Sequence, residues 1–235
     1  GPSAKAPFDI DWEIAKSLLD APVNVNGRSN KDVVRPVASA IDLVRNSRNK
    51  WTIDFGLMDE EEAAQYEMPF EYVRKTVYPI RVENRRSDFR GSWWQYARPR
   101  PEMRTALHGL QRMIVTPAVS KHRIFVWIDT NVLCNQGTVV FARQDDYFFG
   151  VLHSLVHQVW SLRMGARHGV GNDPTYNNTT CFETFPFPWP PGTEPTDDPR
   201  VQAIAAAAAD LVAQRDAWLN PPGLSEQALQ KRTLT

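Results

Sequence analysis

Residues 147–164 read Tyr-Phe-Phe-Gly-Val-Leu-His-Ser-Leu-Val-His-Gln-Val-Trp-Ser-Leu-Arg-Met, and this stretch decides the fold class. Its apolar side chains recur with the period of an α-helix over about five turns. The spacing predicts one helix over residues 147–164. Asp145 and Asp146 precede it as an acidic N-terminus, and Gly165 is expected to close it as a C-cap.

Three segments before this helix have the composition of strands, namely residues 113–115, 124–128 and 138–142. The short connection Asn135-Gln-Gly137 predicts a hairpin tip, with the last two strands paired antiparallel. Another strand is expected at residues 51–55. Residues 166–180 are polar and contain glycine, so we expect an exposed loop there. The aromatic, proline-rich residues 182–189 are expected to form an extended strap on the core.

Further helices are predicted at residues 12–19, from Asp59, at 70–77 after Pro69, at 201–219 and at 224–231. Pro99 and Pro101 predict extended or turning backbone around them. The fold class is therefore α+β, with a mixed, largely antiparallel sheet, packed helices and a small helical extension. We expect residues 1–3 to be a tag remnant, residues 4–192 one domain, and residues 193–235 a linker and helical extension.

The overall charge gives no sign of an anionic partner, because 27 Lys plus Arg balance 27 Asp plus Glu among the 235 residues. The local balance differs: residues 74–123 hold twelve basic and three acidic residues, which leaves nine net positive charges. Arginine dominates this segment, and its planar fork suits phosphate oxygens and guanine edges. Charge alone leaves two interpretations open, a nucleic-acid surface or solvated salt-bridge partners.

The composition also excludes several protein classes. No run of 18 apolar residues and no secretion leader occur in the sequence, so neither a membrane partner nor an export signal is predicted. Cys134 and Cys181 are too few for a disulfide framework or a four-thiolate zinc site. A cytoplasmic location is the expectation.

Two motifs suggest catalysis only weakly. His153 and His157 lie four residues apart, but Ser-Leu-Val between them lacks the glutamate of a zinc hydrolase, so a structural or groove-lining role is favoured. The tetrad Asn220-Pro-Pro-Gly lacks the aromatic fourth residue of amino-methyltransferases and is predicted to end a helix. The alternatives that remain are a metal-dependent hydrolase using this histidine pair, a methyltransferase using Asn220, and a protein-interaction module that docks through Trp93, Trp94 and Trp189.

Side chains that match base-edge donors and acceptors gather in three expected loops. The sequences are Ser120-Lys-His-Arg123, Asn135-Gln136, and Arg167-His168 with Asn172-Asp173. Loops on a rigid scaffold are common places for recognition residues. Candidates for phosphate contact, taken from the charge pattern, are Arg85, Arg86, Arg90, Arg98, Arg100, Lys121, His122 and Arg123.

Longer motifs point to a family. Residues 112–127 (Arg-Met-Ile-Val-Thr-Pro-Ala-Val-Ser-Lys-His-Arg-Ile-Phe-Val-Trp), 145–154 (Asp-Asp-Tyr-Phe-Phe-Gly-Val-Leu-His-Ser) and 179–188 (Thr-Thr-Cys-Phe-Glu-Thr-Phe-Pro-Phe-Pro) resemble the target recognition domain of MmeI-like DNA methyltransferases. These are type IIL restriction-modification enzymes, whose single chain joins nuclease, adenine-N6 methyltransferase and specificity domain. The resemblance extends to residues 32–36 and 51–56.

The resemblance implies a domain that binds double-stranded DNA and positions a target adenine for methylation. It implies two base-reading windows, the first at Asn135, Gln136 and Gly137 and the second at Arg167, His168, Asn172 and Asp173. No catalytic residue, metal or cofactor is expected in this stretch. S-adenosylmethionine would belong to the methyltransferase domain of the parent chain, which is also an expected partner.

Overall fold

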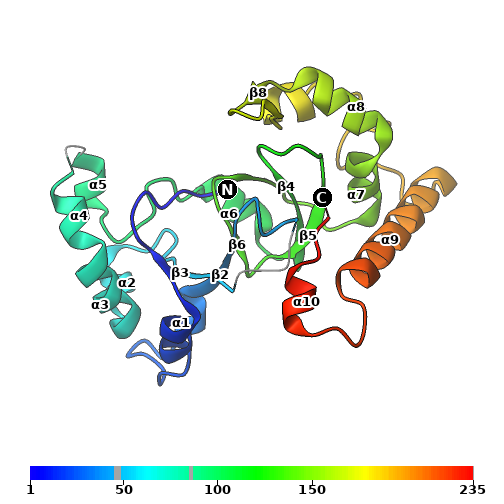
Figure 1. Ribbon diagram of the computed structural model, residues 1–235. Coiled ribbons are helices and arrows are strands. Elements are labelled where there is room, and N and C mark those ends of the chain that lie inside the picture. Colours follow the sequence, from blue (N-terminus) through cyan, green and yellow to red (C-terminus); the bar gives the residue numbers. More distant parts are fainter. Residues whose placement is uncertain (45–48, 85–86, 235) are drawn as a thin grey trace. The chain divides into compact units, whose positions relative to one another are not determined.

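The structure is a computed structural model that describes residues 1–44, 49–84 and 87–234. It divides into two compact units, shown with their elements in Figure 1. Unit 1 consists of Gly1–Ala38, Arg48–Thr105 and Asn131–Gln136, and unit 2 of Ser39–Ser47, Ala106–Thr130 and Gly137–Thr235. This grouping differs from the predicted division at residue 192, because unit 2 includes the helices expected as a separate extension.

Unit 1 contains a four-stranded sheet in the order β1 (Asp9–Ile10), β3 (Trp51–Ile53), β2 (Val34–Ala38) and β6 (Leu133–Cys134). β3 is antiparallel to both β1 and β2, whereas β6 runs parallel to β2. The strand expected at residues 51–55 is therefore confirmed over its first part. This mixed sheet, together with the antiparallel sheet of unit 2 and the helices of both, confirms the α+β class.

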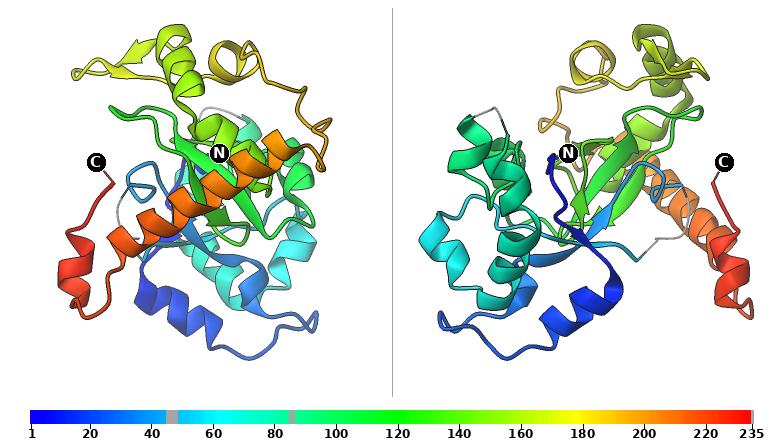
Figure 2. Two further views of the ribbon diagram at one scale, coloured as in Figure 1. Left: turned by 90° about the vertical axis from the view of Figure 1, so that its right-hand side faces the viewer. Right: turned by 60° about the vertical axis from the view of Figure 1, so that its left-hand side comes forward.

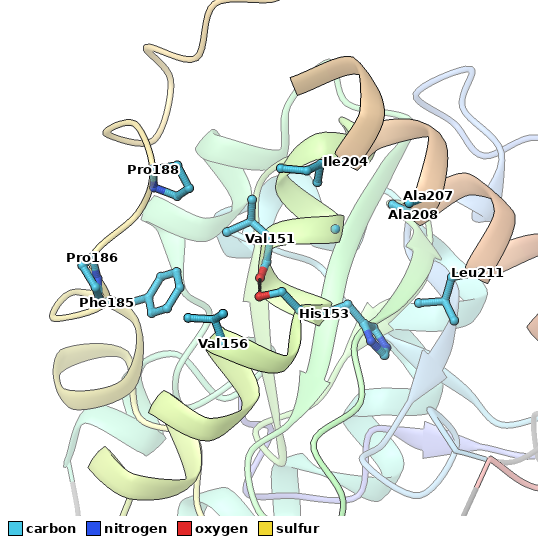
Figure 3. A pocket seen from close by; sticks show the side chains of 12 residues that line it. Val151, His153, Val156, Phe185, Pro186, Pro188, Ile204, Ala207, Ala208 and Leu211 are labelled. Carbon is cyan, nitrogen blue, oxygen red and sulfur yellow. Dashed lines mark hydrogen bonds between the residues drawn. The ribbon is translucent and has the colours of Figure 1, made fainter. Parts of the chain in front are cut away.

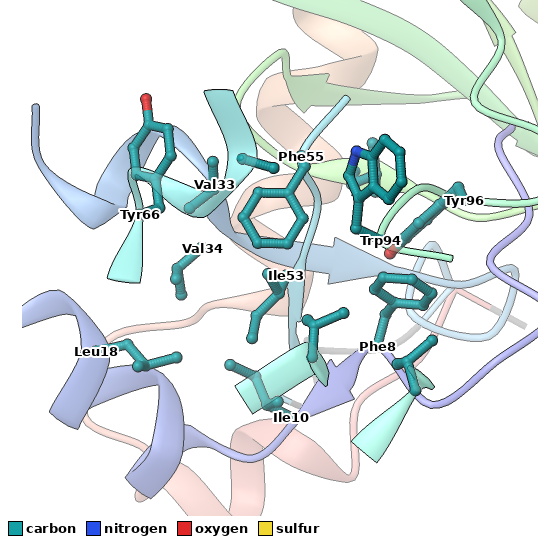
Figure 4. Close-up of a cluster of buried hydrophobic side chains, with 14 of the residues drawn as sticks. Phe8, Ile10, Leu18, Val33, Val34, Ile53, Phe55, Tyr66, Trp94 and Tyr96 are labelled. Carbon is teal, nitrogen blue, oxygen red and sulfur yellow. The ribbon is translucent and has the colours of Figure 1, made fainter. Parts of the chain in front are cut away.

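The core of unit 1 lies between this sheet and its helices (Figure 4). Helix α1 (Trp12–Leu19) contributes Leu18, and the sheet contributes Ile10 and Ile53. The short elements η1 (Asn30–Asp32) and α2 (Glu60–Ala64) complete this part. Asp59 begins α2 as predicted: its carboxylate accepts a hydrogen bond from the backbone N–H of Glu62, whose carboxylate accepts one from the N–H of Asp59.

Three prolines of unit 1 lie in the first turn of a helix. Pro69 lies inside α3 (Glu67–Thr76), Pro79 inside α4 (Tyr78–Val82), and Pro101 opens α6 (Pro101–Leu107). α5 (Ser87–Gly91) lies between α4 and α6. Two helices are found here as predicted, but they are divided at Gln65 and Tyr66 and not at Pro69. The non-helical backbone predicted around Pro99 is confirmed at residues 98–100, whereas Pro101 begins a helix, so the prediction is wrong from there on. The first turn of a helix tolerates proline because its N–H groups have no partner within the helix.

Unit 2 contains an antiparallel sheet in the order β5 (Val126–Asp129), β4 (Arg112–Pro117) and β7 (Thr138–Phe141). Ile114 of the central strand lies opposite Trp127 of β5 and Phe141 of β7. The predicted direct pairing of residues 124–128 with 138–142 is wrong, because both strands flank β4. The residues that connect them form β6 in unit 1, so Asn135-Gln-Gly137 is not a hairpin tip.

The apolar stretch 147–164 forms two helices, α7 (Asp146–His153) and α8 (Leu155–Met164), and not the single helix predicted. Ser154 is extended, with ψ of 152°, and its Oγ accepts a hydrogen bond from the N–H of His157. It therefore caps a new helix within an uninterrupted apolar period. After this break, three apolar side chains of α8 face solvent, with exposed fractions of 73%, 69% and 60%: Leu155, Val156 and Val159.

The long helix α9 (Pro199–Leu219) packs against α7, as Figure 2 shows from two sides. Gly150 permits the close approach, because a Cβ atom there would lie 2.7 Å from Ile204 Cγ2 and 3.2 Å from Ala208 Cβ. α9 ends at Asn220, which confirms the prediction for the Asn-Pro-Pro-Gly tetrad, and α10 (Glu226–Gln230) follows. No helix of the described chain is long and apolar enough to cross a bilayer.

The aromatic strap follows the π-helix η2 (Asn178–Phe182) and covers the core of unit 2. Phe187 stacks on Phe148 of α7, with the ring centroids 5.5 Å apart. Phe185 is buried and contacts His157 edge to face. The predicted role of residues 182–189 is thereby confirmed.

Candidate nucleic-acid interface

The second predicted window forms a β-hairpin in unit 2 instead of the irregular loop expected. Its strands are β8 (Arg167–His168) and β9 (Asp173–Pro174), with His168 opposite Asp173. All four polar candidates of this window therefore lie on one small element. Arg167, His168 and Asn172 are exposed, and Asp173 is half-buried.

A tight turn closes the hairpin. The N–H of Asn172 donates to the carbonyl of Gly169 over 3.0 Å, which leaves Val170 and Gly171 at the tip. Gly169 has φ of +78° and Asn172 φ of +51°, a region that glycine and asparagine tolerate best. Arg167 Nη1 donates to the Asn172 carbonyl over 3.2 Å, so one of its N–H groups stabilises the turn and others remain for a ligand.

One hydrogen bond closes the base of the hairpin, and a second joins it to the rest of unit 2. The N–H of Thr175 donates to the carbonyl of Ala166 over 2.8 Å, and the N–H of Ser120 donates to the carbonyl of Pro174 over 3.2 Å. The second bond joins the hairpin to the loop between β4 and β5. Lys121 and His122 lie on that loop, both exposed. The structure thus brings these two phosphate candidates next to the second window.

Gly165 connects α8 to the hairpin. It is the C-cap of α8, as predicted, and its N–H donates to the Ser161 carbonyl. Its φ of −76° is not left-handed, so the position needs glycine for lack of space and not for its backbone conformation. A Cβ atom there would lie 2.3 Å from the Thr175 carbonyl oxygen and 2.8 Å from that of Ser161. The helix end and the hairpin base could not both keep their positions with a side chain between them.

We expect Gly165→Ala to lower the free energy of unfolding by about 1–3 kcal/mol, because the new methyl group collides with backbone. Urea denaturation followed by circular dichroism measures this change. Gly91→Ala is the matched control: a Cβ atom at Gly91 meets nothing within 4 Å, so this variant should lose no stability. Equal stability of the two variants would contradict the close contact.

Arg123 is corrected as a phosphate candidate, because its side chain is buried, with an exposed fraction of 5%. Its Nη1 donates to Thr116 Oγ1 and to the Pro117 carbonyl, and its Nη2 donates to the Pro174 carbonyl over 3.3 Å. Burial lowers the pKa of this guanidinium to about 10. Arg123 stabilises the fold beneath the loop and is not available to a phosphate.

In the sequence, the first window is divided between the two units, since Asn135 and Gln136 belong to unit 1 and Gly137 to unit 2. Asn135 continues the parallel pairing after β6, since its N–H donates to the Ala38 carbonyl over 2.9 Å. Gln136 is exposed, and its side-chain oxygen accepts a hydrogen bond from Ser3 Oγ over 2.7 Å, which leaves its amide N–H groups as donors. The carbonyl of Gly137 accepts a bond from the N–H of Ala118. Base contact by this window stays a prediction.

Three phosphate candidates of unit 1, Arg90, Arg98 and Arg100, are exposed. Arg100 has φ of +59°, which costs a residue other than glycine about 1 kcal/mol or more. The remaining two candidates, Arg85 and Arg86, lie outside the described residues.

Several arginines of the predicted basic segment stabilise the fold through hydrogen bonds and ion pairs, so the segment as a whole does not form a free basic surface. Arg81 is buried and donates to the carbonyls of Ala4 and Gln95. Arg104 forms an ion pair of 2.9 Å with buried Asp54. Arg112 pairs with Asp146 at 3.0 Å and lies over the ring of Trp127. With Arg123, four of the twelve basic residues are therefore committed to the fold.

The histidine pair has the structural and groove-lining roles that were favoured. His157 is fully buried, with Nδ1 donating to the Leu152 carbonyl over 2.7 Å and Nε2 accepting from the Tyr176 hydroxyl over 3.0 Å. His153 lines an apolar groove of about 430 Å³ with Val151, Phe185 and Leu211 (Figure 3). Among residues 1–44, 49–84 and 87–234, no group of three or more metal-ligating side chains occurs.

The tryptophans do not form the exposed docking surface of the interaction-module alternative. Trp93 and Trp94 are buried in unit 1, where their indole N–H groups donate to the Glu60 carboxylate and the Met58 carbonyl. Trp189 is half-buried in unit 2, beneath the guanidinium of Arg200 at 4.9 Å.

Comparison with known proteins identifies a family for this chain and a solved structure with a similar fold. Residues 19–189 match the family model described as the MmeI target recognition domain. A solved structure of the type IIL restriction-modification enzyme MmeI in complex with DNA is similar to 97% of this chain, with a TM-score of 0.69 and 17% sequence identity. The chain spans 28% of the length of that enzyme chain. No curated protein matches this chain.

Proposed function

Because the chain belongs to the family of MmeI target recognition domains, we propose that it recognises double-stranded DNA in a sequence-specific manner. The hairpin of residues 166–175 reads base edges in the major groove, and Lys121 and His122 beside its base contact phosphates. The exposed arginines of unit 1 add further phosphate contacts, and the first window adds base contacts. Phosphate contacts position a protein on DNA, whereas base contacts supply its specificity.

The geometry of the hairpin is the single observation that carries this proposal. A two-stranded ribbon fits the major groove, which is about 12 Å wide in B-DNA. The hairpin presents an arginine, a histidine, an asparagine and a carboxylate within a few residues, and these groups match the donors and acceptors of base edges. Its base is closed by the hydrogen bond between Thr175 and Ala166 and joined to the rest of unit 2 through Ser120, so the side chains are held before the ligand arrives.

The finer part of the proposal concerns the parent protein. There, the domain positions one adenine for flipping into the pocket of an adenine-N6 methyltransferase of type IIL. S-adenosylmethionine is held by that methyltransferase domain of the same chain, which is a partner of this domain. In the present chain, Gly169 and Gly171 lie in a β-turn and not between a strand and a helix, so they do not fit a cofactor-phosphate or nucleotide cradle.

The experiment measures the affinity of the chain for a random duplex and for its preferred site at two salt concentrations. Methylated adenines in DNA exposed to the parent enzyme, found by sequencing, identify that site. We expect the affinity to fall steeply with salt: for each tenfold rise in salt concentration, its logarithm should fall by about 0.9 per neutralised phosphate. Arg167→Ala should reduce the preference for the specific site by about 1–3 kcal/mol, because one base contact is lost.

Lys16→Ala is the control, because Lys16 is an exposed lysine of α1 outside the basic segment. This variant should keep the salt dependence and the site preference of the wild type. A flat salt response would contradict phosphate contact. Unchanged specificity in Arg167→Ala would contradict base recognition by the hairpin. Methylation of other bases by the parent enzyme would contradict only the assignment of adenine as the target.

A further inference from the structure

Val170 has the highest exposed fraction, 109%, among the large apolar side chains of the described residues. It is the second residue of the turn Gly169–Asn172, at the tip of the hairpin that extends away from α8 in Figures 1 and 2. Turns favour glycine and polar residues, because these adopt the turn geometry and remain hydrated. A valine at this place keeps apolar surface in water, so a ligand that covers it gains free energy.

The residues around Val170 make the tip narrow. Gly169 and Gly171 flank it, and a Cβ atom added at Gly169 would meet nothing within 4 Å. Since neither neighbour has a side chain, the two methyl groups of Val170 are the bulk of the tip. Arg167 and His168 lie behind it on β8, and Asn172 follows it in the turn.

We propose that Val170 contacts the C5-methyl group of one thymine in the major groove, an inference that rests on the proposed function. The thymine methyl is the apolar group that base pairs display in that groove, beside hydrogen-bond donors and acceptors. A valine cannot hydrogen-bond to the polar edges, so it distinguishes thymine from cytosine by this methyl. Arg167 and Asn172, on either side of Val170 in the sequence, supply the hydrogen bonds to neighbouring base edges.

The test uses duplexes in which each thymine of the preferred site is replaced singly by deoxyuridine, which lacks only the C5-methyl group. At one position we expect the wild-type chain to bind the deoxyuridine duplex about fourfold more weakly, as burial of one methyl group implies. Val170→Ala should bind the two duplexes of that position equally. Arg167→Ala should still distinguish them, because the methyl contact is separate from its hydrogen bonds.

Val25→Ala is the matched control, since Val25 is an exposed valine, at 73%, in a turn of unit 1. It should retain the difference between thymine and deoxyuridine. A wild-type chain that is insensitive to every replacement would overturn the inference and leave sequence-specific binding intact. A difference that persists in Val170→Ala would also overturn it. Equal binding to all sequences would instead contradict the proposed function itself.

Discussion

Arg123→Ala is expected to lower the free energy of unfolding by about 3 kcal/mol, because buried acceptors lose their donor. The guanidinium bridges β4, through Thr116 and Pro117, to β9, through Pro174. It also lies 5.0 Å from the ring centroid of Tyr176, and truncation would remove that packing. Urea denaturation measures the loss. Hydrogen exchange at Tyr176, whose N–H donates to the Ala118 carbonyl, should report loosening of the same region.

Lys121→Ala is the matched control, two residues away in sequence but exposed. Its stability should stay within about 0.5 kcal/mol of the wild type. Its DNA affinity should depend less steeply on salt, because binding should release about one counterion fewer than binding of the wild type. If Arg123→Ala were fully stable and instead reduced the salt dependence, the guanidinium would contact phosphate after all, and its assignment to the fold would be wrong.

Acidification is expected to destabilise unit 2 by about 3 kcal/mol between neutral pH and pH 4, through His157. Burial lowers the pKa of His157 from 6.5 to about 4. The hydrogen bond that Nε2 accepts from the Tyr176 hydroxyl requires a neutral ring. The bond that Nδ1 donates to the Leu152 carbonyl acts in the opposite direction and raises the pKa, but burial outweighs it. Arg123 and His153 oppose a positive charge there as well.

The sign follows from proton binding. Between pH 4 and 6.5 the unfolded chain binds a proton at His157 that the folded chain does not, so stability rises with pH in this window. The contribution is complete above pH 6.5 and is lost as the pH falls towards 4. Denaturation at a series of pH values measures it, and NMR titration of the imidazole gives its pKa directly. Exposed His122→Gln should leave the pH profile unchanged, whereas an imidazole that titrates near 6.5 in the folded protein would contradict the prediction.

Local signals predicted much of the fold correctly. Asp59 and Asp145 begin helices because a carboxylate can accept the first backbone N–H groups whatever the rest of the chain does. Ser154 carries the same kind of signal, but the uninterrupted apolar period around it obscured the break between α7 and α8. The strand order was not predictable from hairpin rules, since β6 in the connection between β5 and β7 pairs with β2, a distant segment.

The formation of the hairpin and the exposure or burial of each arginine depend on long-range contacts. Residues 166–175 contain polar and turn-forming residues that are typical of any loop. The strands β8 and β9 exist only because the two ends of this segment pair in the folded structure. Likewise, the sequence shows Lys121, His122 and Arg123 as neighbours of similar charge. The structure exposes the first two and buries the third, because Thr116, Pro117 and Pro174 meet around its guanidinium.

By itself, the sequence determined the family resemblance, the α+β class, most of the helices and the exposed polar segment that contains the hairpin. The family rests on the resemblance of longer motifs, whereas the fold class and the helices follow from side-chain types at short spacing, which are present before the chain folds. Tertiary structure alone decided which cations remain in water, how the strands are ordered and that a valine stands at the hairpin tip. Burial and strand pairing depend on contacts between residues that lie far apart in the chain, and local sequence patterns do not predict such contacts.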